Sequence, residues 1–165
     1  MTRPAIDQLP ASRIREVANA GLGRSDVLAF WFGESDEVTP QTVRDAAAAS
    51  LQRGETFYSP NLGLAELREA IAGYTSALHR PIGPERIAVT SSGVSALMVA
   101  MQMLAGAGDE VVAVVPVWPN LTAQPAILGA EVVRVPLVSR DDGAWTLDLA
   151  RVLSVVTDRT RVLLV

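Results

Sequence analysis

At Val89-Thr90-Ser91-Ser92-Gly93-Val94-Ser95-Ala96, a β-branched run meets small polar residues and an apolar helical pattern begins. Glycine lets a backbone approach an anion closely, the first N–H groups of a helix lack intrahelical partners, and serine hydroxyls add further donors. The stretch is therefore predicted to be a strand-to-helix turn that suits a phosphate group. An ordinary capped turn without a ligand is the alternative.

Strand and helix patterns alternate on both sides of this turn. Helices are expected over residues 95–104, 120–128 and 147–154, and strands over residues 87–90, 110–115, 132–135 and 161–165. Continuous β-branched runs separated by helices are typical of a parallel sheet with helices on both faces, so the fold class is α/β. Asn120 and Thr146 are the expected N-caps of the second and third helices. The inward positions expected of the first helix are Leu97, Ala100, Met101 and Leu104.

The first ninety residues have a more helical pattern. A short helix is expected over residues 12–20, and a second one begins at Thr39-Pro40, with threonine as the N-cap and proline at the first helical position. Apolar residues at helical spacing predict a third helix over residues 64–78. Residues 1–40 are expected to form an N-terminal arm or small-domain segment.

Composition narrows the class of protein. The chain has 165 residues, of which 49% are hydrophobic, which is enough for a globular core. The net charge is -4 and the basic residues are scattered, so neither a nucleic acid nor a membrane surface is an expected partner. The longest apolar run, residues 111–118, is far too short to span a bilayer. With no cysteine and no secretory signal pattern, a cytoplasmic location is expected, and no metal-ligand cluster is apparent.

All 14 basic residues are arginines, and the sequence contains no lysine. A mechanism that needs an ε-amino group is therefore not available to these residues alone. The one histidine, His79, lies beside Arg80-Pro81 at a predicted helix end, where a surface or capping role is favoured over a catalytic base.

Five motifs in order carry a resemblance to a known family. They are Gly33-Glu34, Thr39-Pro40, Tyr58-Ser59-Pro60-Asn61-Leu62-Gly63-Leu64-Ala65-Glu66-Leu67-Arg68, Thr90-Ser91-Ser92-Gly93-Val94-Ser95-Ala96-Leu97 and Pro116-Val117-Trp118-Pro119-Asn120. With the alternating strand and helix pattern, they resemble the class I/II pyridoxal-phosphate-dependent aminotransferases of fold type I. The resemblance implies that residues 41–165 are an incomplete pyridoxal-phosphate-binding large domain with a parallel-rich sheet and covering helices.

The resemblance also implies roles for individual residues. In the family, the cofactor phosphate is held at the positions that match Ser92, Gly93, Val94 and Ser95. Trp118 matches the aromatic that stacks on the pyridine ring, although a buried core tryptophan is an equal alternative. Tyr58 matches a tyrosine that reaches the cofactor phosphate of the neighbouring subunit, and a packed loop residue is its alternative. Gly33 matches a position near the substrate carboxylate, and Arg68 matches an arginine with a structural role.

The implied function is amino-group transfer from an amino acid to a 2-oxo acid, in a homodimer that uses pyridoxal 5'-phosphate. The family attaches this cofactor to a lysine, which these residues lack, so no catalytic residue is assigned. The sequence is expected to be an N-terminal portion of such an enzyme that ends within the large domain and is inactive alone. Another fold type I enzyme, such as a C–S lyase or a decarboxylase, or a non-catalytic cofactor-binding or pairing module, is the alternative.

Overall fold

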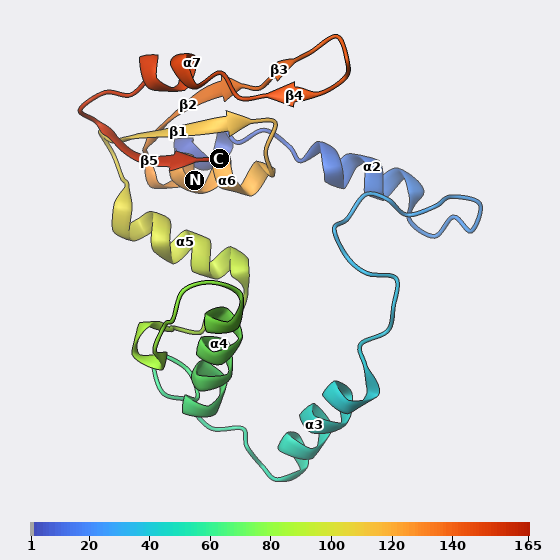
Figure 1. Ribbon diagram of the computed structural model, residues 1–165. Coiled ribbons are helices and arrows are strands. Elements are labelled where there is room, and N and C mark those ends of the chain that lie inside the picture. Colours follow the sequence, from blue (N-terminus) through green and yellow to red (C-terminus); the bar gives the residue numbers. More distant parts are fainter. Residues whose placement is uncertain (1) are drawn as a thin grey trace. The chain divides into compact units, whose positions relative to one another are not determined.

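The computed structural model describes residues 2–165, which divide into two compact units. One unit combines the N-terminal segment up to Ala11 with residues Thr90–Val165, and the other comprises Ser12–Val89. Figure 1 shows the elements of each unit along the chain. Within residues 2–165 there is no helix of the length and apolar character needed to cross a membrane.

A parallel sheet lies at the centre of the first unit. Its strand order is β2-β1-β5, with β1 at Glu110–Val115, β2 at Glu131–Pro136 and β5 at Thr160–Leu164. Both neighbours run parallel to β1, and Val111 is in register with Val132 and Val162. The predicted parallel α/β sheet is therefore confirmed.

Apolar side chains of β1 alternate between two clusters, as the period of two in a strand requires. Val111 packs with Met101, Ala105 and Ala130, while Val112 and Val114 pack with Val135 and Val152. The first cluster draws on α5 (Gly93–Leu104) and the second on α7 (Leu149–Ser154), so both faces of β1 are covered. α6 (Pro119–Leu128) packs against α5 and β2, and the short α1 (Pro4–Asp7) packs against α6.

Two short strands, β3 (Val138–Ser139) and β4 (Trp145–Thr146), form an antiparallel hairpin that the sequence pattern does not predict. The turn Asp141-Asp142-Gly143 lies at its tip, and Gly143 has the positive φ that favours glycine there.

The second unit is helical. It contains α2 (Arg13–Gly21), α3 (Gln41–Gln52), α4 (Ala65–Leu78) and the 3-10 turn η1 (Pro84–Arg86). Arg68 of α4 donates hydrogen bonds to the carbonyl oxygens of Pro84 and Ile87, so it ties α4 to η1 and has a structural role.

Several local predictions are wrong. Residues 87–90 are extended but pair with no strand; the Ile87 N–H donates to the Pro84 carbonyl and the Val89 N–H to the Leu62 carbonyl. Leu97 and Leu104 of α5 are exposed, and only Met101 of its four predicted inward residues is buried. The predicted caps Thr39, Asn120 and Thr146 are not caps, because α3, α6 and α7 begin after Pro40, Trp118 and Asp148.

Candidate cofactor site

The candidate phosphate site lies at the first turn of α5. Ser92 is the N-cap, and its hydroxyl oxygen accepts a hydrogen bond from the Ser95 N–H at 3.2 Å. The Ser95 hydroxyl lies 3.0 Å from that of Ser92 and 3.2 Å from that of Ser91. The turn therefore brings three hydroxyl groups together at the N-terminus of a 12-residue helix.

Two backbone donors of this turn have no partner. Among residues 2–165, the Gly93 and Val94 N–H groups make no hydrogen bond. A Cβ placed on Gly93 would have no heavy atom within 4 Å, so the space beside the turn is open. Two free N–H groups, three hydroxyls and the positive end of the helix dipole are the donor set that a phosphate prefers.

Trp118 belongs to the same unit and stands directly before α6. It is 44% exposed, so its ring is neither fully buried nor free of protein contact. Within residues 2–165 it is therefore not a buried core tryptophan. A half-exposed indole next to a rigid Pro119 can offer one flat face to a planar ligand.

Gln124 of α6 is a polar residue near the first turn of α5, and the sequence motifs do not point to it. It is buried, at 5% exposure, and its Nε2 donates a hydrogen bond to the Val94 carbonyl oxygen at 3.1 Å. α6 also contains the polar residues Asn120 and Thr122, so no sequence signal singles out Gln124.

Tyr58 and Gly33 both lie in the second unit, in the non-helical segments on either side of α3. Tyr58 is fully exposed beside the highly exposed Phe57, so it is not a packed loop residue within residues 2–165. Gly33 lies in an exposed bend, and a Cβ there would have no neighbour within 4 Å. The first unit thus contains the Ser92–Ser95 turn at the start of α5 and Trp118 directly before α6, while the second holds the other two predicted positions.

A family model for aminotransferases of class I and II matches residues 26–165. The chain belongs to this family. The match covers most of the chain, including the first turn of α5, Trp118 and Tyr58, so the resemblance predicted from the sequence motifs is confirmed.

Individual relatives of this aminotransferase-family chain agree with the family model. The aspartate aminotransferase of Pyrococcus horikoshii is 30% identical over 93% of this chain and 39% of its own length. The aspartate/prephenate aminotransferase of Thermus thermophilus is 34% identical over 85% of the chain and 36% of its own length. The chain spans about two fifths of the length of the curated relatives it matches.

The fold also matches solved aminotransferases. The Thermus thermophilus aspartate aminotransferase with maleate superposes on the whole chain with a TM-score of 0.87 and 30% identity, over 44% of that structure. An aspartate aminotransferase from Thermotoga maritima gives a TM-score of 0.85 with 29% identity. The expected fold, a partial fold type I transferase, is therefore confirmed.

Members of this family depend on pyridoxal phosphate, whose 5'-phosphate and pyridine ring make separate demands on a site. The α5 turn fits the phosphate, because its free N–H groups of Gly93 and Val94 adjoin open space. Trp118 offers the flat surface that a pyridine ring requires. The described residues thus include donors of the kind a phosphate needs and an aromatic face of the kind a pyridine ring needs.

Proposed function

We propose that the protein is a pyridoxal-phosphate-dependent aminotransferase. Residues 41–165 would supply the phosphate and ring contacts of its cofactor-binding domain, and residues 1–40 would form an N-terminal arm or small-domain segment. The observation that carries the proposal is the pair of unpartnered N–H groups on Gly93 and Val94, next to clustered serine hydroxyls. The absence of cysteine fits a cytoplasmic protein.

Each residue has a separate role in this proposal. The N–H groups of Gly93 and Val94 and the hydroxyls of Ser92 and Ser95 hold the phosphate, and the α5 dipole favours its charge. The Trp118 ring covers the pyridine and excludes water from one face. Bound pyridoxal phosphate supplies an electron sink for the carbanion formed when an amino acid loses its α-proton.

The proposed substrates are an amino acid and a 2-oxo acid, with backbone at Gly33 near the substrate carboxylate. Aspartate is the first amino donor to test, because several relatives are named aspartate aminotransferases. The 165 residues contain no lysine, so a lysine that moves the α-proton is not among them, and these residues are proposed to be inactive alone.

A homodimer is proposed for the active protein. The exposed aromatic pair Phe57 and Tyr58 supports it, because large aromatic side chains are enriched in protein interfaces. In the dimer, the Tyr58 hydroxyl would donate to the cofactor phosphate held by the partner subunit.

Calorimetric titration with three ligands tests the cofactor proposal. Pyridoxal phosphate should bind at least about tenfold more tightly than pyridoxal, because charged hydrogen bonds to a phosphate contribute about 1.5–3 kcal/mol each. Inorganic phosphate should compete with pyridoxal phosphate. Equal affinity for pyridoxal and pyridoxal phosphate would show that the α5 turn does not hold the phosphate.

A non-catalytic cofactor-binding or pairing module is the second candidate, favoured by the absence of lysine. Both candidates bind pyridoxal phosphate, but they differ in their response to an amino acid. Protein isolated from its natural source should convert pyridoxal phosphate to the amine form when aspartate is added if it is an aminotransferase. A module would bind the cofactor and leave it unchanged, whereas a lyase or decarboxylase would release a different product.

A further inference from the structure

Gln124 lies inside the protein with only half of its side-chain amide satisfied. Only 5% of the residue is exposed, so it is 95% buried. Its Nε2 donates a hydrogen bond to the Val94 carbonyl oxygen at 3.1 Å. Its Oε1 has no hydrogen-bond partner among residues 2–165. The Val94 oxygen fixes the amide orientation, because turning the amide over would place two acceptors against each other.

Stability does not account for a glutamine at this position. A buried carbonyl oxygen without a partner costs at least as much stability as the one bond that Nε2 makes contributes. A methionine has a similar length and would fill the same apolar surroundings without an orphaned polar atom. The glutamine therefore has to be explained by what its one hydrogen bond holds in place.

The bond holds one particular peptide group. The Val94 carbonyl belongs to the planar peptide that joins Val94 to Ser95, so fixing the oxygen also orients the Ser95 N–H. That N–H donates to the Ser92 hydroxyl at 3.2 Å. Gln124 of α6 thus holds the carbonyl of this peptide, and the Ser92 cap holds its N–H group. The peptide leads into Ser95, whose side chain supplies one of the clustered hydroxyls.

The same bond connects the two halves of the candidate site. Gln124 lies six residues after Trp118, which is about 9 Å along α6 at 1.5 Å per residue. Helix α6 is therefore a short rigid link between the tryptophan at its start and the first turn of α5.

We propose that Gln124 is a positioning residue, which fixes the first turn of α5 relative to Trp118 so that the turn can receive a phosphate at a set distance from the ring. This inference rests on the proposed function for the identity of the ligand. Gln124 itself is not placed against the cofactor and acts through the Val94–Ser95 peptide.

The test compares Gln124→Met with Thr122→Val. Gln124→Met removes both polar atoms of Gln124, whereas Thr122→Val removes a hydroxyl of the same helix whose one hydrogen bond among residues 2–165 is to the Pro119 carbonyl. The measurements are calorimetric affinities for pyridoxal phosphate and for pyridoxal, the thermal midpoint, and the exchange rate of the Ser95 amide without ligand. Gln124→Glu is a third variant, which keeps the side-chain length but offers the Val94 oxygen an acceptor.

Gln124→Met should lower the affinity for pyridoxal phosphate about tenfold, which is the effect of one misaligned hydrogen bond to the phosphate. The affinity for pyridoxal should stay unchanged. Its thermal midpoint should stay the same or rise, its Ser95 amide should exchange faster, and Gln124→Glu should lose at least as much affinity. Thr122→Val should match the parent protein in both affinities.

Two results would overturn the inference. One is a Gln124→Met variant that keeps the parent's affinity for pyridoxal phosphate, which would make Gln124 a packing residue only. The other is an unchanged exchange rate of the Ser95 amide in that variant, which would show that Gln124 does not hold the Val94–Ser95 peptide. A parent protein that binds pyridoxal and pyridoxal phosphate equally contradicts the proposed function instead, and the Ser95 amide then decides the inference by itself.

Discussion

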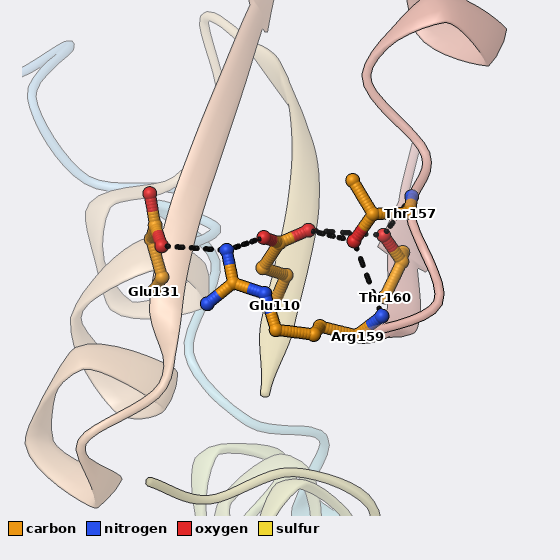
Figure 2. Close-up of polar contacts among 5 residues, drawn as sticks. All are labelled: Glu110, Glu131, Thr157, Arg159 and Thr160. Carbon is orange, nitrogen blue, oxygen red and sulfur yellow. Dashed lines mark hydrogen bonds and ion pairs between the residues drawn. The ribbon is translucent and has the colours of Figure 1, made fainter. Parts of the chain in front are cut away.

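The guanidinium of Arg159 forms an ion pair with the buried carboxylate of Glu110 at the first residue of β1 (Figure 2). Glu110 is only 3% exposed, and its other oxygen accepts a hydrogen bond from the Thr157 hydroxyl at 2.6 Å. The Glu110 N–H in turn donates to the Arg159 carbonyl at 2.8 Å. One buried acid therefore joins the central strand to the turn before β5, although 49 positions separate the two residues.

Replacing this acid should destabilise the first unit. Glu110→Gln removes the charge that faces Arg159, and we expect a loss of about 1–3 kcal/mol in the free energy of unfolding, the usual range for a buried charged hydrogen bond. A larger loss is not expected, because Arg159 keeps 59% of its side chain exposed and can regain water. Urea denaturation of the two proteins measures the difference.

The matched control is Glu131→Gln. Glu131 also faces Arg159, at 3.6 Å, but its side chain is 62% exposed, so this substitution should change stability by less than about 1 kcal/mol. Equal losses in the two variants would mean that burial of Glu110 does not set the strength of the pair.

Asp109 should titrate below its ordinary range. The Gly106 N–H donates to one carboxylate oxygen at 3.0 Å and Arg161 donates to the other at 3.1 Å, and both bonds lower the pKa of Asp109, the backbone bond most. Because the folded pKa lies below the unfolded value of about 3.9, the stabilisation is complete above that pH and is lost as the pH falls through the folded pKa.

Carboxyl NMR titration of Asp109 measures this shift directly. In Arg161→Gln the pKa should rise only part of the way to its ordinary value, because the Gly106 bond remains. Asp109→Asn should make urea stability less sensitive to pH as the pH falls below about 4, since the group that titrates there is gone. A complete return of the pKa in Arg161→Gln would show that the arginine, and not the backbone, causes the shift.

Sequence periodicity predicts elements well where their neighbours lie close along the chain. The β-branched run of β1 and the apolar spacing of α4 each specify their own structure, and the helix predicted over residues 95–104 is observed as α5, which begins two residues earlier at Gly93. Residues 87–90 have the same β-branched character, yet they form no sheet, because a strand also needs a partner and propensity does not provide one.

Helix starts and long-range polar contacts are the parts that sequence patterns miss. Asp148 caps α7 instead of Thr146, since its carboxylate accepts the Arg151 N–H at 2.9 Å and a charged acceptor suits a helix N-terminus. Gln124 goes unnoticed because its acceptor, Val94, lies 30 residues away. The candidate phosphate-binding turn at the start of α5 is made of neighbouring residues and can be predicted from them. Gln124, which is proposed to position that turn, cannot be predicted because its contact is long-range.

Gly63 in the second unit should not tolerate a side chain. Its φ is +96°, and a Cβ there would lie 2.7 Å from the Val89 Cβ, so Gly63→Ala combines backbone strain with a steric clash. We expect a loss of about 2–4 kcal/mol, since strain at positive φ alone costs about 1–2 kcal/mol. Gly54→Ala is the control, because Gly54 also has positive φ but has open space around its Cβ position. If both variants lose the same stability by urea denaturation, the contact with Val89 contributes nothing.

Ser92→Ala should affect both stability and ligand binding. The substitution removes the cap of α5 and should cost about 1 kcal/mol in unfolding free energy. It also removes a proposed phosphate ligand and loosens the Ser95 N–H, so pyridoxal phosphate affinity should fall at least about tenfold, while pyridoxal affinity changes little.

Ser12→Ala separates these two effects. Ser12 caps α2 in the same way, by accepting the Arg15 N–H at 3.3 Å, so its replacement should cost a similar amount of stability. It lies in the other unit, away from the α5 turn along the chain, and should leave the affinity for pyridoxal phosphate unchanged. A Ser12→Ala protein that loses the cofactor as readily as Ser92→Ala would mean that binding follows overall stability. In that case the donors at the first turn of α5 would no longer be needed to explain how the phosphate is held.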